Sequence, residues 1–237
     1  MLDIGGESSR PGALPVPLEL ELERVVPVVR YAVGLGIPIS VDTYKPEVMR
    51  AVLALGADII NDIWALRQPG ALDVVAAHPG CGVCLMHMHR EPQTMQAQPM
   101  SGNVVRQVTD FLKAAALRLA NAGIKPRRVV LDAGIGFGKS VAQNFGLLAH
   151  QAELMALGYP LLAGWSRKSS LALACNGLGA TAGAGDMADR LVPSIAAALL
   201  AVERGARIVR VHDVRETAQA LAVWNAARLF DGERSSE

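Results

Sequence analysis

The chain has 237 residues and a mass of 25.0 kDa, with 51% hydrophobic, 19% charged and 4% aromatic residues. This composition excludes a disordered chain, and the length is sufficient to bury one large core. Lys and Arg total 23 against 22 Asp and Glu, so the net charge of +1 favours neither a nucleic acid nor a membrane as partner. Three cysteines cannot cross-link the fold, which favours a reducing compartment. We therefore expect a cytoplasmic protein.

The first residues predict the end of a β-strand. Met1-Leu2-Asp3-Ile4-Gly5-Gly6 has neither the basic region nor the long apolar stretch of a signal peptide. It has instead a short apolar run followed by a glycine turn. A domain rarely begins in the middle of a strand, so the expectation is a fold whose opening unit is missing.

Along the rest of the chain, short apolar runs alternate with longer segments of helical periodicity. Strands are expected at 2–4, 37–41, 58–61, 82–86, 129–131, 161–163 and 208–211. Helices are expected at 18–35, 46–55, 71–78, 102–122, 141–157, 186–204 and 214–229. The strand runs do not alternate polar and apolar residues, which is typical of parallel strands buried on both faces.

Regular βα alternation is compatible with an open doubly wound sheet or a closed (β/α)₈ barrel. Seven units and a start inside a strand favour an α/β fold of the (β/α)₈ TIM-barrel type, truncated at its N-terminus by one βα unit. No break in composition divides the chain, so residues 1–237 are expected to form a single domain.

Polar side chains follow every expected strand, and in a parallel barrel all these ends meet at one face, where active sites lie. The cationic and donor side chains among them suit a phosphate or diphosphate. The carboxylates and amide suit a flat nitrogen heterocycle with adjacent N–H donors. The residues concerned are Arg10, Asp42, Asn61, Asp132, Lys168, Arg210 and His212. The sequence therefore predicts a pocket for an anionic, nitrogen-rich substrate.

Other patterns are weaker. The segment from Ala133 to Ser140 approaches the phosphate-binding G-x-x-x-x-G-K-S pattern but lacks its first glycine. Cys81-x-x-Cys84 resembles half of a redox or zinc site but lacks a second pair of cysteines, so we expect both to be core residues. His87-x-His89 has spacing seen in metal sites, but no nearby ligand completes a set.

Ser166 and Ser169 have no obvious His–Asp partner order for a nucleophilic serine. Trp64 and Trp165 are either rim packing or substrate walls, and the sequence leaves both readings open.

Several segments resemble dihydropteroate synthase, a family of pterin-binding TIM barrels. They occur in the family's order over essentially the whole chain. They are Asp3-Ile-Gly-Gly-Glu-Ser-Ser-Arg-Pro-Gly12, Ile39-Ser-Val-Asp-Thr43, Ile60-Asn-Asp-Ile63, Cys84-Leu-Met-His-Met88, Asp132-Ala-Gly-Ile-Gly-Phe-Gly-Lys139, Ser166-Arg-Lys-Ser169 and Ile208-Val-Arg-Val-His-Asp213.

The resemblance implies that the chain is a transferase of folate biosynthesis, which condenses 6-hydroxymethyl-7,8-dihydropterin diphosphate with 4-aminobenzoate. The products would be 7,8-dihydropteroate and pyrophosphate. The implied pterin-binding residues are Asp42, Asn61, Met86, Asp132, Lys168 and Arg210. The implied diphosphate-binding residues are Ser9, Arg10, Arg210 and His212. The implied aminobenzoate-binding residues are Arg10, Pro11, Phe137, Lys168 and Ser169. Asp132, Lys168, Arg210 and His212 would be catalytic.

The resemblance also implies Mg²⁺ on the diphosphate and a homodimer. The family's magnesium-binding Asn belongs to a first strand with no counterpart here, so no metal ligand is predicted in this chain. Ser9 stands where the family usually has Thr, and Ala133, Ile135 and His89-Arg90 also depart from its pattern. A start codon placed inside a longer reading frame, or a non-catalytic copy, would each explain the missing unit.

Two alternatives stay open beside the synthase. One is a corrinoid-type methyltransferase pterin domain, which would use the same fold and pocket with a cobamide protein as its partner. The other is a non-catalytic, truncated pterin-binding paralogue. Lys168-Ser169 and the Ser9-Arg10-Pro11 loop favour the synthase.

Overall fold

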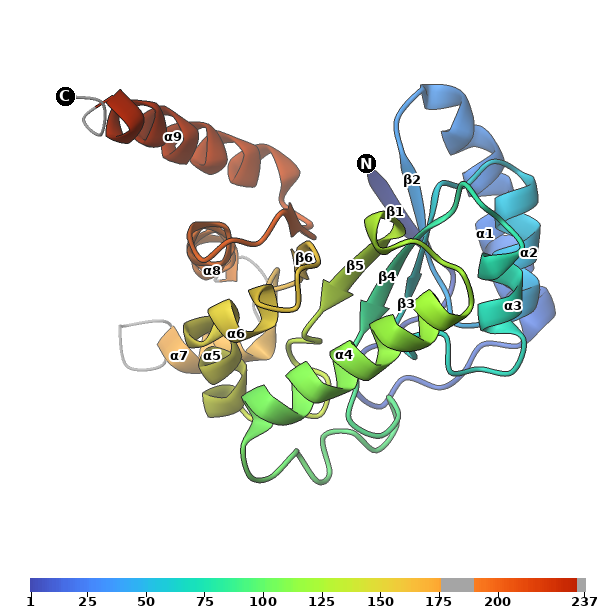
Figure 1. Ribbon diagram of the computed structural model, residues 1–237, viewed down its shortest axis with the longest axis horizontal. Coiled ribbons are helices and arrows are strands. Elements are labelled where there is room, and N and C mark those ends of the chain that lie inside the picture. The colour runs from blue at the N-terminus through green and yellow to red at the C-terminus, as the bar shows by residue number, and fades with distance from the viewer. Residues whose placement is uncertain (176–189, 234–237) are drawn as a thin grey trace.

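A computed structural model describes residues 1–175 and 190–233 of the chain. In this part of the chain seven parallel strands form one curled sheet in the sequential order β1 to β7 (Figure 1). The strands are β1 (Leu2–Gly5), β2 (Ile39–Asp42), β3 (Ile59–Asp62), β4 (Gly82–Met86), β5 (Val129–Asp132), β6 (Leu161–Ala163) and β7 (Ile208–Val209). All seven expected strands are therefore present, and their ends lie within two residues of those predicted.

The helices α1 to α8 are between successive strands along the chain, on the outer side of the curled sheet, and α9 follows the last strand (Figure 1). The α-helices are α1 (Leu18–Ala32), α2 (Pro46–Ala54), α3 (Ala71–Ala76), α4 (Val104–Asn121), α5 (Val141–Ala149), α6 (Gln151–Met155), α7 (Ser169–Cys175), α8 (Leu191–Glu203) and α9 (Val214–Glu233). The short 3₁₀ turn η1 (Val33–Leu35) extends α1, and a second one, η2 (Pro126–Arg128), precedes β5.

Three helix predictions need correction or qualification. The single helix expected at 141–157 is two helices that meet at His150, whose φ of −101° and ψ of 25° leave the α-helical range. The helix α7 was not predicted, because its short Ser-Ser-Leu-Ala-Leu-Ala run follows the polar end of β6 directly. The start expected for α8 at residue 186 lies outside the described residues.

Local sequence signals account for several helix boundaries. Ser140 and Gln143 form a reciprocal capping box at the start of α5, and the side chain of Asn103 caps α4. Pro46 occupies the first turn of α2, where its missing N–H costs no hydrogen bond. Gly36 and Gly205 follow helices with φ of +70° and +97°, the left-handed geometry that ends a helix.

The strand register places the polar strand ends beside one another. Gly5 on β1 lies opposite Asp42 on β2, and Asp42 lies opposite Asn61 on β3. Met86 on β4 lies opposite Asp132 on β5. Because all strands run in parallel, these residues share the carboxyl edge of the sheet.

The hydrophobic core fills the space between the sheet and the helices that cover it. Among its fully buried residues are Ile60 on β3, Leu85 on β4 and Leu131 on β5, together with Leu112 and Leu119 on α4. Cys81 and Cys84 are also buried, which confirms that they are core residues. This core fixes the strands whose ends carry the polar groups.

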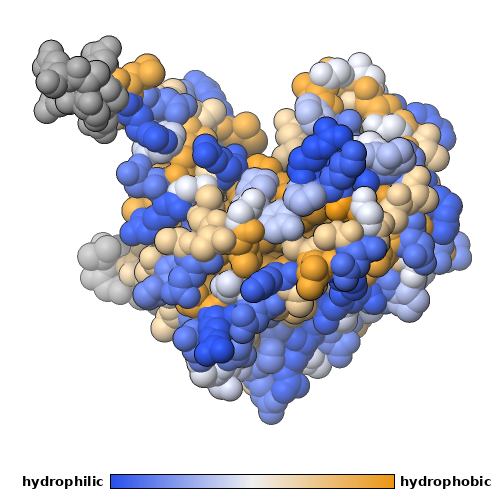
Figure 2. All heavy atoms as spheres, in the orientation of Figure 1, coloured by the Kyte–Doolittle hydropathy of each residue, from blue (hydrophilic) through white to orange (hydrophobic). Residues whose placement is uncertain are grey.

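The sheet is open between its two end strands, β1 and β7, which do not pair with each other. Figure 1 shows β1 and β7 on opposite sides of this opening, with α9 extending away from the sheet. Figure 2 shows that this face is hollowed between α9 and the β1–β2 side, and that apolar and polar side chains both border the hollow. No helix in the described ranges is long and apolar enough to cross a membrane.

Candidate active site

A cavity of about 600 Å³ opens at the carboxyl ends of the strands. Each of the seven strands, or the loop directly after it, contributes to its lining. The structure brings together in this cavity all the site residues named from the sequence: Ser9, Arg10, Pro11, Asp42, Asn61, Met86, Asp132, Phe137, Lys168, Ser169, Arg210 and His212. The expected convergence of the strand ends is therefore confirmed.

Two carboxyl groups lie at the base of the cavity. Burial, followed by the nearby charge of Asp3, raises the pKa of Asp42 to about 7, although Arg210 Nη2 donates to Asp42 Oδ2 at 3.2 Å. Burial also raises the pKa of Asp132, against the opposing effects of the Gly134 N–H, which donates to Oδ1 at 2.7 Å, and of Lys168. Both side chains can accept hydrogen bonds from a bound heterocycle.

Lys168 supplies a cation between these acceptors and an aromatic wall. Burial lowers its pKa to about 8, while the charges of Asp132 and Asp42 oppose that effect. Its Nζ lies 4.4 Å from the centre of the Phe137 ring, within the range of a cation–π contact. Phe137 is itself buried, so this part of the cavity is apolar on one side and charged on the other.

Asp3 is a site residue that the sequence analysis missed. Its Oδ2 accepts from Arg210 Nε at 2.5 Å and from Asn61 Nδ2 at 3.2 Å. Its Oδ1 is buried and has no hydrogen-bond partner in the described part of the chain. Asp3 therefore orients two cavity residues at once, and the ion pair with Arg210 joins the β1 and β7 sides of the open sheet. The only sequence signal was a charged residue inside an apolar strand.

Ser166 and His212 form a pair that the sequence did not indicate, since they are 46 residues apart. Ser166 Oγ lies 2.8 Å from His212 Nδ1 and accepts from the His212 backbone N–H at 3.1 Å. Burial, with the charges of Arg167 and Arg210, lowers the pKa of His212, so the ring is neutral at pH 7. Ser166 therefore has a histidine neighbour that the order of residues in the sequence did not reveal.

The neighbouring residues hold this pair in place. The guanidinium of Arg167 donates to both carboxylate oxygens of Asp213, Nη2 to Oδ1 at 2.5 Å and Nε to Oδ2 at 3.1 Å. This two-point pair joins the loop after β6 to the residues after β7. The loops that carry Ser166 and His212 are thus held together by a bidentate contact.

The loop after β1 carries Ser9, Arg10 and Pro11 and is tied down at its base. Glu7 accepts from the Val16 N–H at 3.0 Å, from the Tyr44 hydroxyl at 2.8 Å and from Lys45 Nζ at 2.5 Å. Lys45 Nζ also donates to the buried Glu21, whose other oxygen accepts from Thr43 Oγ1 at 2.7 Å. The base of the loop is therefore fixed to β2 and α1.

The two tryptophans left open by the sequence do not line the cavity. Trp165 is buried against Phe145, with ring centres 5.2 Å apart, and belongs to the core. Trp64 is half-buried, and the guanidinium of Arg67 lies 5.0 Å from the centre of its ring. Both are packing residues in this structure.

The described residues do not provide a protein-held metal site. No group of three or more His, Cys, Asp or Glu among them could hold a metal ion. The carboxylates of Asp3 and Asp42 are both paired with Arg210. His87, one half of the candidate His87-x-His89 pair, directs Nδ1 to Lys139.

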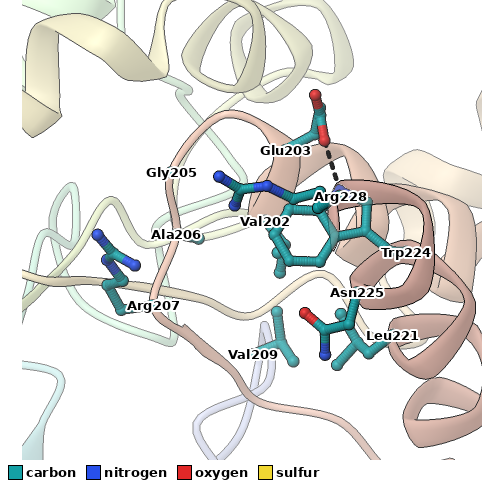
Figure 3. Close-up of a pocket in the computed structure, with 10 residues that line it drawn as sticks. All are labelled: Val202, Glu203, Gly205, Ala206, Arg207, Val209, Leu221, Trp224, Asn225 and Arg228. Atoms are coloured by element: carbon teal, nitrogen blue, oxygen red, sulfur yellow. Dashed lines mark hydrogen bonds between the residues drawn. The ribbon is translucent and has the colours of Figure 1, made fainter. Parts of the chain in front are cut away.

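A second cavity, of about 530 Å³, lies away from these residues, beside β7 and between α8 and α9. Figure 3 shows the Trp224 indole hydrogen-bonded to Glu203 and Arg228 stacked on the indole ring, with 4.7 Å from guanidinium carbon to ring centre. It contains none of the residues named from the sequence.

The cavity thus combines carboxylates, an amide and cations at the carboxyl edge of a parallel α/β sheet. Residues 1–212 match the family of pterin binding enzymes. The dihydropteroate synthase of Neisseria meningitidis serogroup B is 48% identical to this chain over 230 residues, which cover 95% of this chain and 78% of that protein.

Solved structures give the same result. The dihydropteroate synthase of Burkholderia cenocepacia complexed with 7,8-dihydropteroate is 52% identical, with a TM-score of 0.87, and the match covers 98% of this chain and 82% of that one. The enzyme of Xanthomonas albilineans with 4-aminobenzoic acid is 48% identical, with a TM-score of 0.87 and coverage of 95% and 78%. The chain belongs to the dihydropteroate synthase family.

Proposed function

We propose that this chain condenses 6-hydroxymethyl-7,8-dihydropterin diphosphate with 4-aminobenzoate, giving 7,8-dihydropteroate and pyrophosphate. The observation that carries the proposal is one cavity whose base holds Asp42, Asn61 and Asp132 and whose mouth holds Arg210 and His212. The related enzymes whose structures contain 7,8-dihydropteroate and 4-aminobenzoic acid support it.

The pterin ring fits the base of the cavity. Its ring N–H and amino groups are donors, and Asp42, Asn61 and Asp132 supply acceptors: Asp42 and Asn61 are opposite each other in the strand register, and Asp132 is at the end of β5. Met86, opposite Asp132, provides an apolar contact for a flat ring. Lys168 supplies a donor for the pterin acceptor atoms.

The diphosphate is assigned to the mouth of the cavity. Arg210 remains charged, since the neighbouring Asp3 and Asp42 raise its pKa against the effect of burial. The Nδ1 of His212 faces Ser166, which leaves Nε2 to donate to a phosphate oxygen. Ser9 and Arg10 add donors from the loop after β1.

The 4-aminobenzoate is assigned to the outer part of the same cavity, between Phe137, Ser169 and the Arg10–Pro11 loop. Phe137 offers an apolar face, while Arg10, Lys168 and Ser169 offer donors for a carboxylate. This location places the amine of the second substrate toward the pterin.

In the reaction, the C–O bond between the pterin methylene and the diphosphate breaks, and its electron pair leaves on pyrophosphate. The amine lone pair forms the new C–N bond, and the amine proton passes to solvent. Asp132 and Asp42 stabilise positive charge that develops on the pterin, while Arg210 and His212 stabilise the leaving group. The aromatic amine needs correct positioning rather than a strong base.

We also propose that Mg²⁺ accompanies the diphosphate. Mg²⁺ keeps several waters and is commonly bound through substrate phosphates rather than by an all-protein cage. Turnover is expected to rise with added Mg²⁺ and to stop with a chelator. Unchanged turnover in the chelator would contradict this part of the proposal.

A single-domain homodimer in the cytoplasm is the remaining part of the proposal. Apolar side chains that stay exposed on α8 and α9, such as Val192, Leu200 and Val223, offer a surface for a second copy. Sedimentation is expected to give twice the mass of 25.0 kDa, and thermal unfolding a single transition. A monomer, or two separate transitions, would contradict it.

The test of the main proposal separates turnover from binding. The purified chain receives the pterin diphosphate with and without 4-aminobenzoate, and pyrophosphate release is followed over time. Release that requires both substrates supports the synthase. Binding of the pterin diphosphate by calorimetry without any release would favour a non-catalytic pterin-binding protein instead.

A further inference from the structure

Lys139 is a buried lysine that the proposed reaction does not use. Only 2% of its surface is exposed, and it does not line the cavity. Its Nζ lies 3.0 Å from His87 Nδ1 and donates to the carbonyl oxygens of Gly134 at 2.9 Å, Phe137 at 3.2 Å and His87 at 3.3 Å. These four partners surround Nζ, so it is not available to a phosphate, as the near match to a phosphate-binding pattern would have required.

His87 complements this lysine. It is 6% exposed, and burial together with the charge of Lys139 lowers its pKa to about 2, so the ring is neutral. A neutral imidazole that faces an ammonium group at Nδ1 accepts there and carries its own proton on Nε2. The ring also packs edge-on against Phe111 of α4, with centres 4.9 Å apart. His87 is therefore a fixed acceptor.

The two loops joined by this pair approach each other very closely. Gly134 has a φ of +67°, and a Cβ built on it would lie 1.8 Å from the His87 carbonyl oxygen. Gly138 has a φ of +70°, and its Cβ would lie 2.7 Å from His89 Cβ. Both positions exclude any side chain, so the loop after β5 lies directly on the residues after β4.

A second buried group holds the other side of the loop. Asn144 accepts from the Gly136 N–H at 2.9 Å and donates to Ser170 Oγ at 2.9 Å on α7. The segment 134–138 is thus fixed between β4 and α7. Phe137 projects from this segment into the cavity, 4.4 Å from Lys168 Nζ.

We propose that Lys139 and His87 form a buried clamp that positions the loop after β5, and with it Phe137, as the wall of the 4-aminobenzoate subsite. The inference rests on the proposed function for the identity of the ligand. Lys139 and His87 are positioning residues, because they act on the substrate only through Phe137 and its loop.

The first test compares Lys139→Met with Lys113→Met, which makes the same change on an exposed position of α4. We expect Lys139→Met to raise the KM for 4-aminobenzoate about tenfold and to change the KM for the pterin diphosphate less than about threefold. Lys113→Met should match the wild type. Equal increases in both KM values, or no increase, would overturn the proposal.

The second test keeps the lysine and changes its acceptor. In His87→Asn the side-chain oxygen can occupy the position of Nδ1, whereas His87→Leu offers no acceptor. We expect His87→Asn to keep the KM for 4-aminobenzoate within about threefold of the wild type and His87→Leu to resemble Lys139→Met. If the two His87 variants behave alike, the hydrogen bond does not position the loop.

The rate of amide hydrogen exchange in the loop after β5 tests the proposed clamp without a measurement of turnover. Peptides that cover residues 133–140 should exchange at least about tenfold faster in His87→Leu than in His87→Asn, with little change in peptides from α1 and α2. Equal exchange in both would overturn the clamp. Failure of the wild type to make dihydropteroate would instead count against the proposed function. The exchange result would still show whether Lys139 and His87 position the loop.

Discussion

At the scale of single residues, the site depends on charged groups that are buried but paired or hydrogen-bonded. Burying a charge without a partner costs free energy, and in these groups an ion pair or a hydrogen bond offsets that cost. Arg210 pairs with Asp3 and Asp42, and Asp132 accepts from the Gly134 backbone. The altered pKa values of Asp42 and Lys168 follow from the same burial, so two of the groups proposed to bind the pterin titrate near neutral pH.

Asp132 provides the simplest test at this scale. Asp132→Asn keeps the shape of the side chain but removes the charge that stabilises the developing cation, so we expect kcat to fall at least about tenfold. The matched control is Asp73→Asn on the exposed face of α3, which should leave the rate unchanged. Near-normal turnover of Asp132→Asn would show that this carboxylate does not serve the pterin.

The pH dependence of kcat/KM for the pterin diphosphate tests the two altered pKa values together. Asp42 is a full acceptor only above its pKa of about 7, and Lys168 is a cation only below its pKa of about 8. We therefore expect a narrow maximum between these values, because kcat/KM reports the free enzyme. Besides burial, the negative charges of Asp3, Asp62 and Glu21 raise the pKa of Asp42, and the positive charge of Arg210 lowers it.

The variant Asp42→Asn isolates the acid side of this profile. The Asn side chain at position 42 cannot titrate, so the kcat/KM of this variant for the pterin diphosphate should fall less steeply than that of the wild type between pH 7 and pH 5. The ionisation of the substrate's own diphosphate is common to both proteins. Identical acid limbs in the two proteins would mean that Asp42 does not control the profile.

At the scale of elements, the loop after β1 depends on a network that lies below the cavity. Lys45 pairs with the buried Glu21 and with Glu7, at the base of the segment that carries Ser9 and Arg10. Removing one member of a buried ion pair leaves the other charge without compensation. The network therefore couples the stability of β2 and α1 to the position of the loop.

Lys45→Met should accordingly destabilise the protein by on the order of 3 kcal/mol in denaturant unfolding. It should also raise the KM for the pterin diphosphate, because Glu7 loses its strongest partner. The double variant Glu21→Gln/Lys45→Met removes both charges, so it should recover part of the lost stability. A double variant that is as unstable as the sum of the two single variants would show that the pair is not coupled.

Much of this element-level architecture could be predicted from the sequence. The runs of buried apolar residues identified all seven strands, and the polar residues directly after them identified the cavity, because parallel strands bring their ends together. Asp3 could not be identified, since its role depends on Arg210, 207 residues away. The Ser166–His212 and His87–Lys139 contacts likewise join residues 46 and 52 positions apart.

At the scale of the whole molecule, an open seven-stranded sheet brings both edges to one site. Asp3 on β1 and Arg210 after β7 form an ion pair across the opening, so the edges are linked through Arg210, a residue that lines the cavity. The structural match to enzymes with bound 7,8-dihydropteroate and 4-aminobenzoic acid includes 95% or more of this chain. We therefore predict that this polypeptide has the residues needed to bring the two substrates together.

The most direct measurement is the mass-spectrometric detection of 7,8-dihydropteroate formed by the purified chain from the pterin diphosphate and 4-aminobenzoate in the presence of Mg²⁺. We predict one dihydropteroate for each pyrophosphate released, and formation of both products at least about tenfold more slowly in Asp132→Asn. Pterin diphosphate binding without any dihydropteroate, at saturating concentrations of both substrates, would contradict it.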